Sequence, residues 1–173
     1  MAKKQFTLAE LKSKYVRESQ VTMIELVLPN DTNMLNKLLG GRLMHWMDIA
    51  CAMAAAKHCN NIAVTAAVDD LAFHVPIKLG NIVTLKASVN RAFNTSMEVG
   101  VKVESEDFET GKIVHTNSAY YTFVSVDKKT GKKMKVPEII PETPVEKKRF
   151  DRALERRDQR IAKHHGIVKN LKS

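Results

Sequence analysis

The residue with the clearest potential for chemistry is Asp48. It lies in the run GGRLMHWMDIACAMAAAKH, residues 40 to 58, which is otherwise almost entirely apolar. A buried carboxylate without a partner is destabilising, so such a residue is usually paired or serves as an acid, base or nucleophile. Asp48 is therefore the first candidate for catalysis. The alternative is structural, because His45 or Arg42 on the same predicted helix could pair with it.

The Gly40-Gly41 pair at the start of this helix is the second candidate. The first amides of a helix have no intrahelical acceptor and carry the positive end of the helix macrodipole, so they suit a carbonyl oxygen that gains negative charge. Gly41 lies seven residues before Asp48, about 10 Å along a helix axis at ~1.5 Å per residue. That distance is too long for one reacting carbonyl. A two-fold dimer, in which the helix start of one subunit faces Asp48 of the other, would bring them together.

Other polar residues point to no metal site or disulfide. The histidines show no HxxH or HxxxH spacing, and Cys51 and Cys59 have no CxxC partner, so we expect no metal and two buried thiols. Asp69 and Asp70 are adjacent in a predicted strand, and their side chains should point to opposite faces. They are not expected to form an acid-base pair.

The elements around the long helix are mainly strands. Alternating apolar residues and intervening turns predict strands at residues 21–29, 62–74, 81–93, 96–106 and 112–127. In SMEVGVKVESE, Met97, Val99, Val101 and Val103 share one face and should pack on the helix, with the other face exposed to solvent. The order β-α-β-β-β-β predicts an α+β hotdog fold, with a curved antiparallel sheet wrapped around one long helix.

Charge and hydropathy define the ends of the domain. Residues 128–173 hold 15 Lys and Arg and 6 Asp and Glu, whereas residues 1–127 hold 13 of each sign. We therefore expect one domain over residues 1–127, with its core at about 15–127, followed over residues 128–173 by a basic linker and a charged C-terminal helix. The tail has too few aromatic residues for a nucleic-acid interface. No transmembrane segment or signal peptide is evident, so we expect a cytoplasmic protein.

Four segments together resemble the acyl-CoA thioesterases (acyl-CoA hydrolases) of the hotdog superfamily: DTNMLNKLLGGRLMHWMD, TAAVDDLAFHVPIKLG, NRAFNTSMEV and HTNSAYYTFVSVD. The resemblance covers about residues 20 to 127 in the same order, with a similar charged C-terminal helix. It implies hydrolysis of acyl-CoA to a free acid and CoA. CoA is then part of the substrate and product, and no separate cofactor is needed.

The resemblance also implies roles for individual residues. Asp48 matches the general base or nucleophile, and Asn33 matches an active-site Asn that we place on the Gly41 side of the site. Family members have their sites between paired subunits, with a trimer of dimers as the expected assembly. Arg91 and the turn Asn94-Thr95-Ser96 are the candidates for contacting the nucleotide part of CoA.

Four positions depart from the family pattern. Phe93 and Asn94 stand where relatives often have Gly and Arg, so the phosphate contacts could differ. Asn36 replaces a frequent Gly and Leu39 a frequent aromatic residue or His, so the acyl pocket could differ as well. Two other functions stay open. One is a non-catalytic module that binds acyl-CoA. The other is a hotdog dehydratase, for which His45, three residues before Asp48, is the supporting feature.

Overall fold

The computed structural model describes residues 11–69, 71–73 and 75–170, with side chains described as far as residue 163. The elements follow in the order β1 Lys14–Tyr15, α1 Val16–Ser19, β2 Val21–Leu26, the 3-10 helix η2 Pro29–Asp31, α2 Gly40–Cys59, β3 Ile62–Val68, β4 Ile82–Ala92, β5 Ser96–Glu106, β6 Ile113–Val126, β7 Ile139–Ile140 and α3 Pro144–Asn170. None of the described helices has the length and apolar character needed to cross a bilayer.

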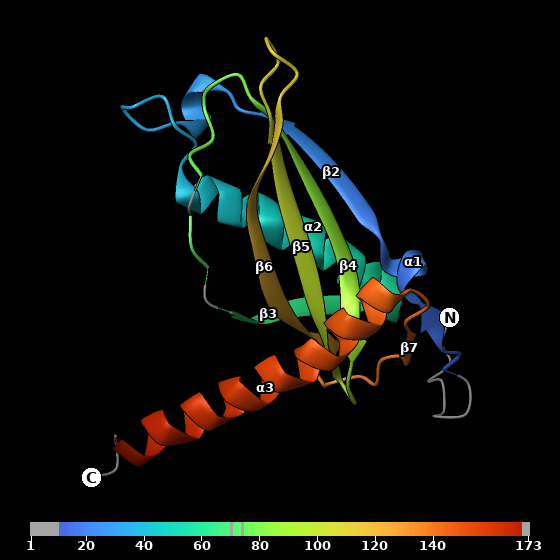
Figure 1. Cartoon of the computed structure of the whole chain (residues 1–173). Helices are drawn as coiled ribbons and strands as arrows, with labels where there is room; N and C mark the ends of the chain where they lie inside the picture. Colours follow the sequence, from blue (N-terminus) through green and yellow to red (C-terminus); the bar gives the residue numbers. More distant parts are fainter. Residues whose placement is uncertain (1–10, 70, 74, 171–173) are drawn as a thin grey trace.

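The main sheet has five antiparallel strands in the order β2-β4-β5-β6-β3 and curves around α2 (Figure 1). The apolar side chains expected on β5 are all buried, as are Met47, Ala50 and Ala54 on the facing side of α2. Alanines on this face leave room for the sheet to approach the helix closely. The helix ends at Asn60, whose left-handed backbone (φ 50°) caps it. The predicted hotdog fold is confirmed.

The strand after α2 is shorter than predicted. β3 was expected to reach residue 74, but its last sheet pair joins Val68 to Tyr121. One more backbone bond follows, from the Asp69 amide to the Tyr120 carbonyl (3.0 Å), and the chain then leaves the sheet. β3 is the last strand in the order β2-β4-β5-β6-β3 and is therefore an edge strand. The residues after it are available to line a pocket.

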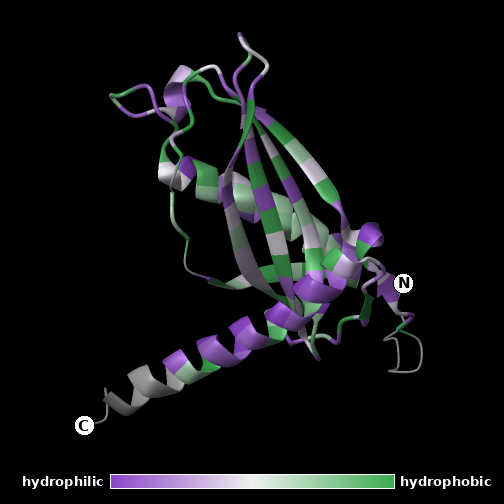
Figure 2. Cartoon of the chain, in the orientation of Figure 1, coloured by the Kyte–Doolittle hydropathy of each residue, from purple (hydrophilic) through white to green (hydrophobic). Residues whose placement is uncertain are grey.

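The alternation in β5 suggested that the outer face of the sheet is exposed to solvent, but part of this face is covered. α3 crosses the lower ends of the strands on this face (Figure 1), and its surface is mostly hydrophilic (Figure 2). Beneath it, Glu98 is only 1% exposed and is bound by Arg156 (2.6 and 3.0 Å) and by Asn90 (2.9 Å). A partner on α3 thus compensates for the burial of a residue that has the sequence pattern of a solvent-facing one.

The segment between β6 and α3 also differs from the expected linker. Val136 and Ile139 are buried in the core, and the Val136 amide donates to the Asn94 carbonyl (3.1 Å). The His58 ring contacts the Pro137 carbonyl at 2.8 Å, which joins this segment to the end of α2. The strand pair β1–β7 extends the same attachment. The segment therefore fixes the start of α3 against the sheet.

Candidate active site

The loop before α2 is held in place by Asn33. Its side-chain oxygen accepts hydrogen bonds from the backbone amides of Leu35 (2.9 Å) and Lys37 (3.2 Å). The backbone amide of Asn33 donates to the Lys37 carbonyl (2.9 Å). Its Nδ2 group has no acceptor among the described residues. Because the oxygen is already used inside the loop, Asn33 can act on a ligand only as a donor.

An ion pair positions the helix start. Asp31, with a side chain only 8% exposed, binds Arg42 at 2.9 Å, and its carbonyl accepts the Leu39 amide (2.9 Å). These contacts connect the Asn33 loop directly to the first turn of α2. They also show that Arg42 does not pair with Asp48, so that alternative from the sequence is wrong.

The amides at the helix start remain open. Within the described chain the backbone N–H groups of Gly40 and Gly41 donate to no acceptor, and an added Cβ at Gly41 would meet nothing within 4 Å. At Gly40 an added Cβ would lie 3.4 Å from the ring of Phe73. The two glycines thus leave exposed donors at the positive end of the helix, next to an aromatic wall.

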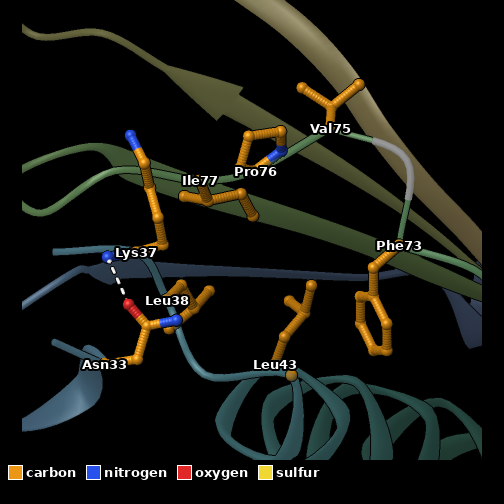
Figure 3. Close-up of a pocket in the computed structure, with 9 residues that line it drawn as sticks. Asn33, Lys37, Leu38, Leu43, Phe73, Val75, Pro76 and Ile77 are labelled. Atoms are coloured by element: carbon orange, nitrogen blue, oxygen red, sulfur yellow. Dashed lines mark hydrogen bonds between the residues drawn. The ribbon is translucent and has the colours of Figure 1, made fainter. Parts of the chain in front are cut away.

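A pocket of about 320 Å³ lies beside this helix start. Figure 3 shows Leu43 rising from α2 toward Phe73, with Asn33 and Lys37 on the opposite side. The pocket is lined by Asn33, Lys37, Leu38, Gly40, Leu43, Phe73, Val75, Pro76 and Ile77. Asn33 and Gly40 are therefore together in one site, as the sequence predicts, and an apolar cavity adjoins them.

Asp48 lies elsewhere on the helix. It is half-buried, and its Oδ1 accepts a hydrogen bond of 2.6 Å from the hydroxyl of Thr65 on β3. Among the described residues, Oδ2 has no hydrogen-bond partner, and His45 forms no hydrogen bond or ion pair with this carboxylate. The Asp48 charge acts on its surroundings, because it adds to the effect of burial in raising the pKa of the Cys51 thiol.

Thr65 is a site residue that the sequence did not reveal. A threonine in an exposed edge strand is common, and its contact with Asp48 arises only when β3 packs beside α2. The pair Asp48–Thr65 is absent from the lining of the Asn33 pocket. One chain therefore carries two separate groups of polar residues, as the distance between Gly41 and Asp48 predicts.

The expected CoA-contacting residues differ in how open they are. The guanidinium of Arg91 donates to the Phe150 carbonyl (3.2 Å) and lies 4.0 Å from the centre of that ring. The sequence predicted that Arg91 would be free to bind phosphates, but its guanidinium is occupied by the contact with Phe150 on α3. In the turn, Asn94 is exposed while Thr95 and Ser96 are half-buried. The turn lies toward the Asp48 end of the sheet, since Met97 and Thr65 both align with the same residue of β6.

Two neighbouring carboxylates were also considered from the sequence as an acid-base pair. Asp69 pairs with Arg160 at 2.7 Å, while Asp70 and His74 lie outside the described residues. Among the residues that are described, no group of three or more His, Cys, Asp and Glu side chains is arranged to hold a metal ion.

Comparisons with known proteins identify the family of the chain. Residues 35–112 match the model of the thioesterase superfamily. The chain is 39% identical over 155 residues to the protein VdlD of Helicobacter pylori, covering 86% of this chain and 88% of that one. It is 37% identical to the cytosolic acyl coenzyme A thioester hydrolase of mouse, covering 87% of this chain but only 40% of that longer protein.

Solved structures give the same result. The acyl-CoA hydrolase of Bacillus cereus aligns with a TM-score of 0.86 at 33% identity, covering 91% of this chain and 96% of that one. That of Staphylococcus aureus, in complex with butyryl coenzyme A, coenzyme A and coenzyme A disulfide, aligns at 0.83 and 35%, covering 93% and 99%. Its solved variants replace an aspartate, a threonine and an asparagine by alanine.

An apo-hexameric acyl-CoA thioesterase also aligns, with a TM-score of 0.84 at 35% identity, covering 88% of this chain and 97% of that one. Sequence and fold thus agree over most of the chain, and the family model agrees over residues 35–112. The chain belongs to the acyl-CoA thioester hydrolases of the thioesterase superfamily.

Proposed function

We propose that this acyl-CoA thioester hydrolase performs hydrolysis at a site that two copies of the chain complete. One copy supplies the Asn33 amide and the helix-start amides of Gly40 and Gly41 to the thioester carbonyl. The other supplies Asp48, positioned by Thr65, as general base toward water or as nucleophile.

The observation that carries this assignment is a spacing. The three positions replaced by alanine in the Staphylococcus aureus enzyme are an asparagine, an aspartate 15 residues later and a threonine 17 residues after that. Asn33, Asp48 and Thr65 are separated by the same 15 and 17 residues. Their identities match as well, so the same three side chains are the leading candidates for function here.

The hydrogen bond from Thr65 supports a chemical role for Asp48. The hydroxyl occupies Oδ1 and leaves Oδ2 as the oxygen available to take a proton or attack a carbonyl carbon. A bond that fixes one carboxylate oxygen also fixes the direction of the other. Donors at Asn33 and the helix start would stabilise the developing oxyanion, and loss of one such donor typically lowers kcat by about 10²–10³.

Exposed apolar side chains on α2 and β3 support the dimer. Side chains between 37% and 46% exposed are Met44, Ile49 and Met53 on α2 and Ile62, Val64 and Val68 on β3. β3 is also an unpaired edge of the sheet. Exposed apolar surface beside a free strand edge is typical of a face that another chain covers. We propose a second copy as that chain and a trimer of dimers as the assembly, which the hexameric relative supports.

Two further assignments belong to this proposal. We place the nucleotide part of CoA near the Asn94-Thr95-Ser96 turn, because this turn is at the Asp48 end of the sheet and Asn94 is exposed there. We propose the cytoplasm as the location, which the name of the cytosolic mouse relative supports.

The test is thiol release from a panel of acyl-CoAs. Asp48→Asn should lower kcat by about 10²–10⁴, the usual contribution of a positioned base, while acyl-CoA still raises the melting temperature. Asp151→Asn, which neutralises an exposed carboxylate on α3, serves as the matched control and should keep wild-type turnover. Wild-type turnover in Asp48→Asn would remove Asp48 from the mechanism, and a wild-type protein that releases no thiol would refute the activity.

A further inference from the structure

The pocket has one wall that is made by irregular chain. This wall segment is residues 69–77, of which 69, 71–73 and 75–77 are described, and it joins β3 to the loop before β4. Phe73, Val75, Pro76 and Ile77 line the pocket from this side (Figure 3). Since its described residues belong to no helix or strand, their position depends on a few individual contacts.

Hydrogen bonds hold the described part of the wall segment at three positions. At its end, Ile77 is buried and its carbonyl accepts the Leu38 amide (2.9 Å). In its middle, the Asn117 side chain on β6 donates to the carbonyl of Ala72. At its start, the Asp69 amide donates to the Tyr120 carbonyl on β6 (3.0 Å), and the Asp69 carboxylate is bound at 2.7 Å by Arg160. The carboxylate of Asp69 is thus held from the C-terminal helix α3, whereas the other contacts come from the hotdog core.

The ion pair between Arg160 on α3 and Asp69 is largely buried. The side chains of Asp69 and Arg160 are only 19% and 25% exposed, and Asp69 Oδ2 is buried without a hydrogen-bond partner. Arg160 therefore donates a hydrogen bond to a carboxylate that is largely removed from water. Removing one member of such a pair leaves a poorly solvated charge, and the chain relieves this by moving the carboxylate outward. Any such movement would displace the wall segment at the point where it leaves β3.

We propose that Arg160 is a positioning residue for the acyl pocket. Through Asp69, α3 fixes the start of the wall segment and so sets how far Phe73 and Val75 stand from α2, which determines the acyl-chain length that the pocket accepts. This inference rests on the proposed function, because it takes the pocket beside Asn33 and Gly40 as the acyl site. It gives α3 a role in substrate selection in addition to its packing on the sheet.

The chain provides a matched control on the same helix. Arg156 also binds a buried carboxylate under α3, but its hydrogen-bond partner is Glu98 on β5. The charges of Arg156 and Asp69 attract each other without a hydrogen bond. Arg156→Gln and Arg160→Gln therefore weaken the docking of α3 in similar ways, while only the second removes a hydrogen bond to Asp69. Arg160→Lys retains the charge, and the exchange Asp69→Arg with Arg160→Asp restores an ion pair of opposite orientation.

Two measurements test the proposal in the full-length protein. The first is kcat/KM for straight-chain acyl-CoAs from two to sixteen carbons. Arg160→Gln should change the ratio of kcat/KM for long acyl-CoAs to kcat/KM for short ones by about tenfold. This is the lower end of the discrimination that one methylene group gives in an apolar pocket. Arg160→Lys and the exchanged pair should recover much of the wild-type ratio, and Arg156→Gln should keep it even if its melting temperature falls.

The second measurement is hydrogen-deuterium exchange of peptides covering residues 69–77, which requires no turnover. Exchange should be faster in Arg160→Gln than in the wild type and unchanged in Arg156→Gln. An unchanged substrate ratio and unchanged exchange in Arg160→Gln would overturn the proposal, as would equal effects of both variants. If the wild type releases no thiol at all, the proposed function fails, and the exchange data still decide whether Arg160 holds the wall segment.

Discussion

The strongest prediction concerns subunits that carry different defects. In the proposed dimer, each site takes Asn33 from one subunit and Asp48 from the other. Asn33→Ala and Asp48→Asn should each inactivate both sites of their own homodimer. A mixed dimer keeps one site in which both residues are intact, because both mutations fall in the other site. Mixing two inactive proteins should therefore restore activity.

The size of the recovery follows from the geometry. The seven residues from Gly41 to Asp48 span about 10 Å of helix, so a site formed within one chain would require a rearrangement of α2. With random pairing of equal amounts, half of the dimers are mixed and each has one intact site of two. The mixture should therefore recover about a quarter of wild-type activity. Each variant alone should be about 100-fold or more below the wild type.

The assay is thiol release after the two variants are dissociated, mixed and reassociated. Native mass spectrometry of a pair of unequal mass measures how many subunits have exchanged. A mixture of Asp48→Asn with Asp48→Ala serves as the control and should recover nothing, because both defects fall on the same side of the site. If exchange is complete and the test mixture stays inactive, the shared site is refuted, and both residues must act within one chain.

Two further predictions concern single residues. Thr65→Val removes a hydrogen bond to a charged group, typically about 1.5–3 kcal/mol, so kcat should fall about tenfold or more with little change in KM. Thr65→Ser should keep most activity, and a wild-type kcat in Thr65→Val would show that Asp48 needs no such support. Burial lowers the pKa of His58, and nearby Lys14 lowers it further, against the opposing hydrogen bond to Pro137. The unfolded state then binds the proton more readily than the folded state, so His58 should lower stability as pH falls below about 6.5, and His58→Gln should lose less melting temperature between about pH 7 and 5.

Periodicity was a reliable guide to the core elements. The apolar run that opens at Gly40 and ends before the Asn60-Asn61 pair is α2 in the structure. The predicted strand bounds were accurate for the strands that pair with a neighbour on both sides. The end of β3 was misplaced because an edge strand can stop wherever its single neighbour releases it. The apolar residues that follow Val68 in the sequence line a pocket. An alternating pattern alone cannot distinguish such residues from the residues of a packed strand.

The site was predictable to the extent that its residues are unusual for their surroundings. Asp48 stands out in an apolar helix, and paired glycines at a helix start are informative, so both could be chosen from the sequence. Thr65 and Arg160 could not, because each acts through a contact with a residue 17 or 91 positions away. Glu98 looked like a solvent-facing residue since nothing local indicates that α3 covers it.

The two ends of the Asn33 side chain impose a constraint on how this loop can vary. Its oxygen shapes the loop by accepting two backbone amides, and its nitrogen is left to face the pocket. Aspartate would preserve the accepting end while placing a negative charge beside the oxyanion that we propose forms there. Serine or histidine would offer a donor but could not reproduce the two accepted bonds at the same reach. In the proposed mechanism a single side chain thus determines both the shape of the loop and its reactivity, which leaves substitution little room to improve one without loss of the other.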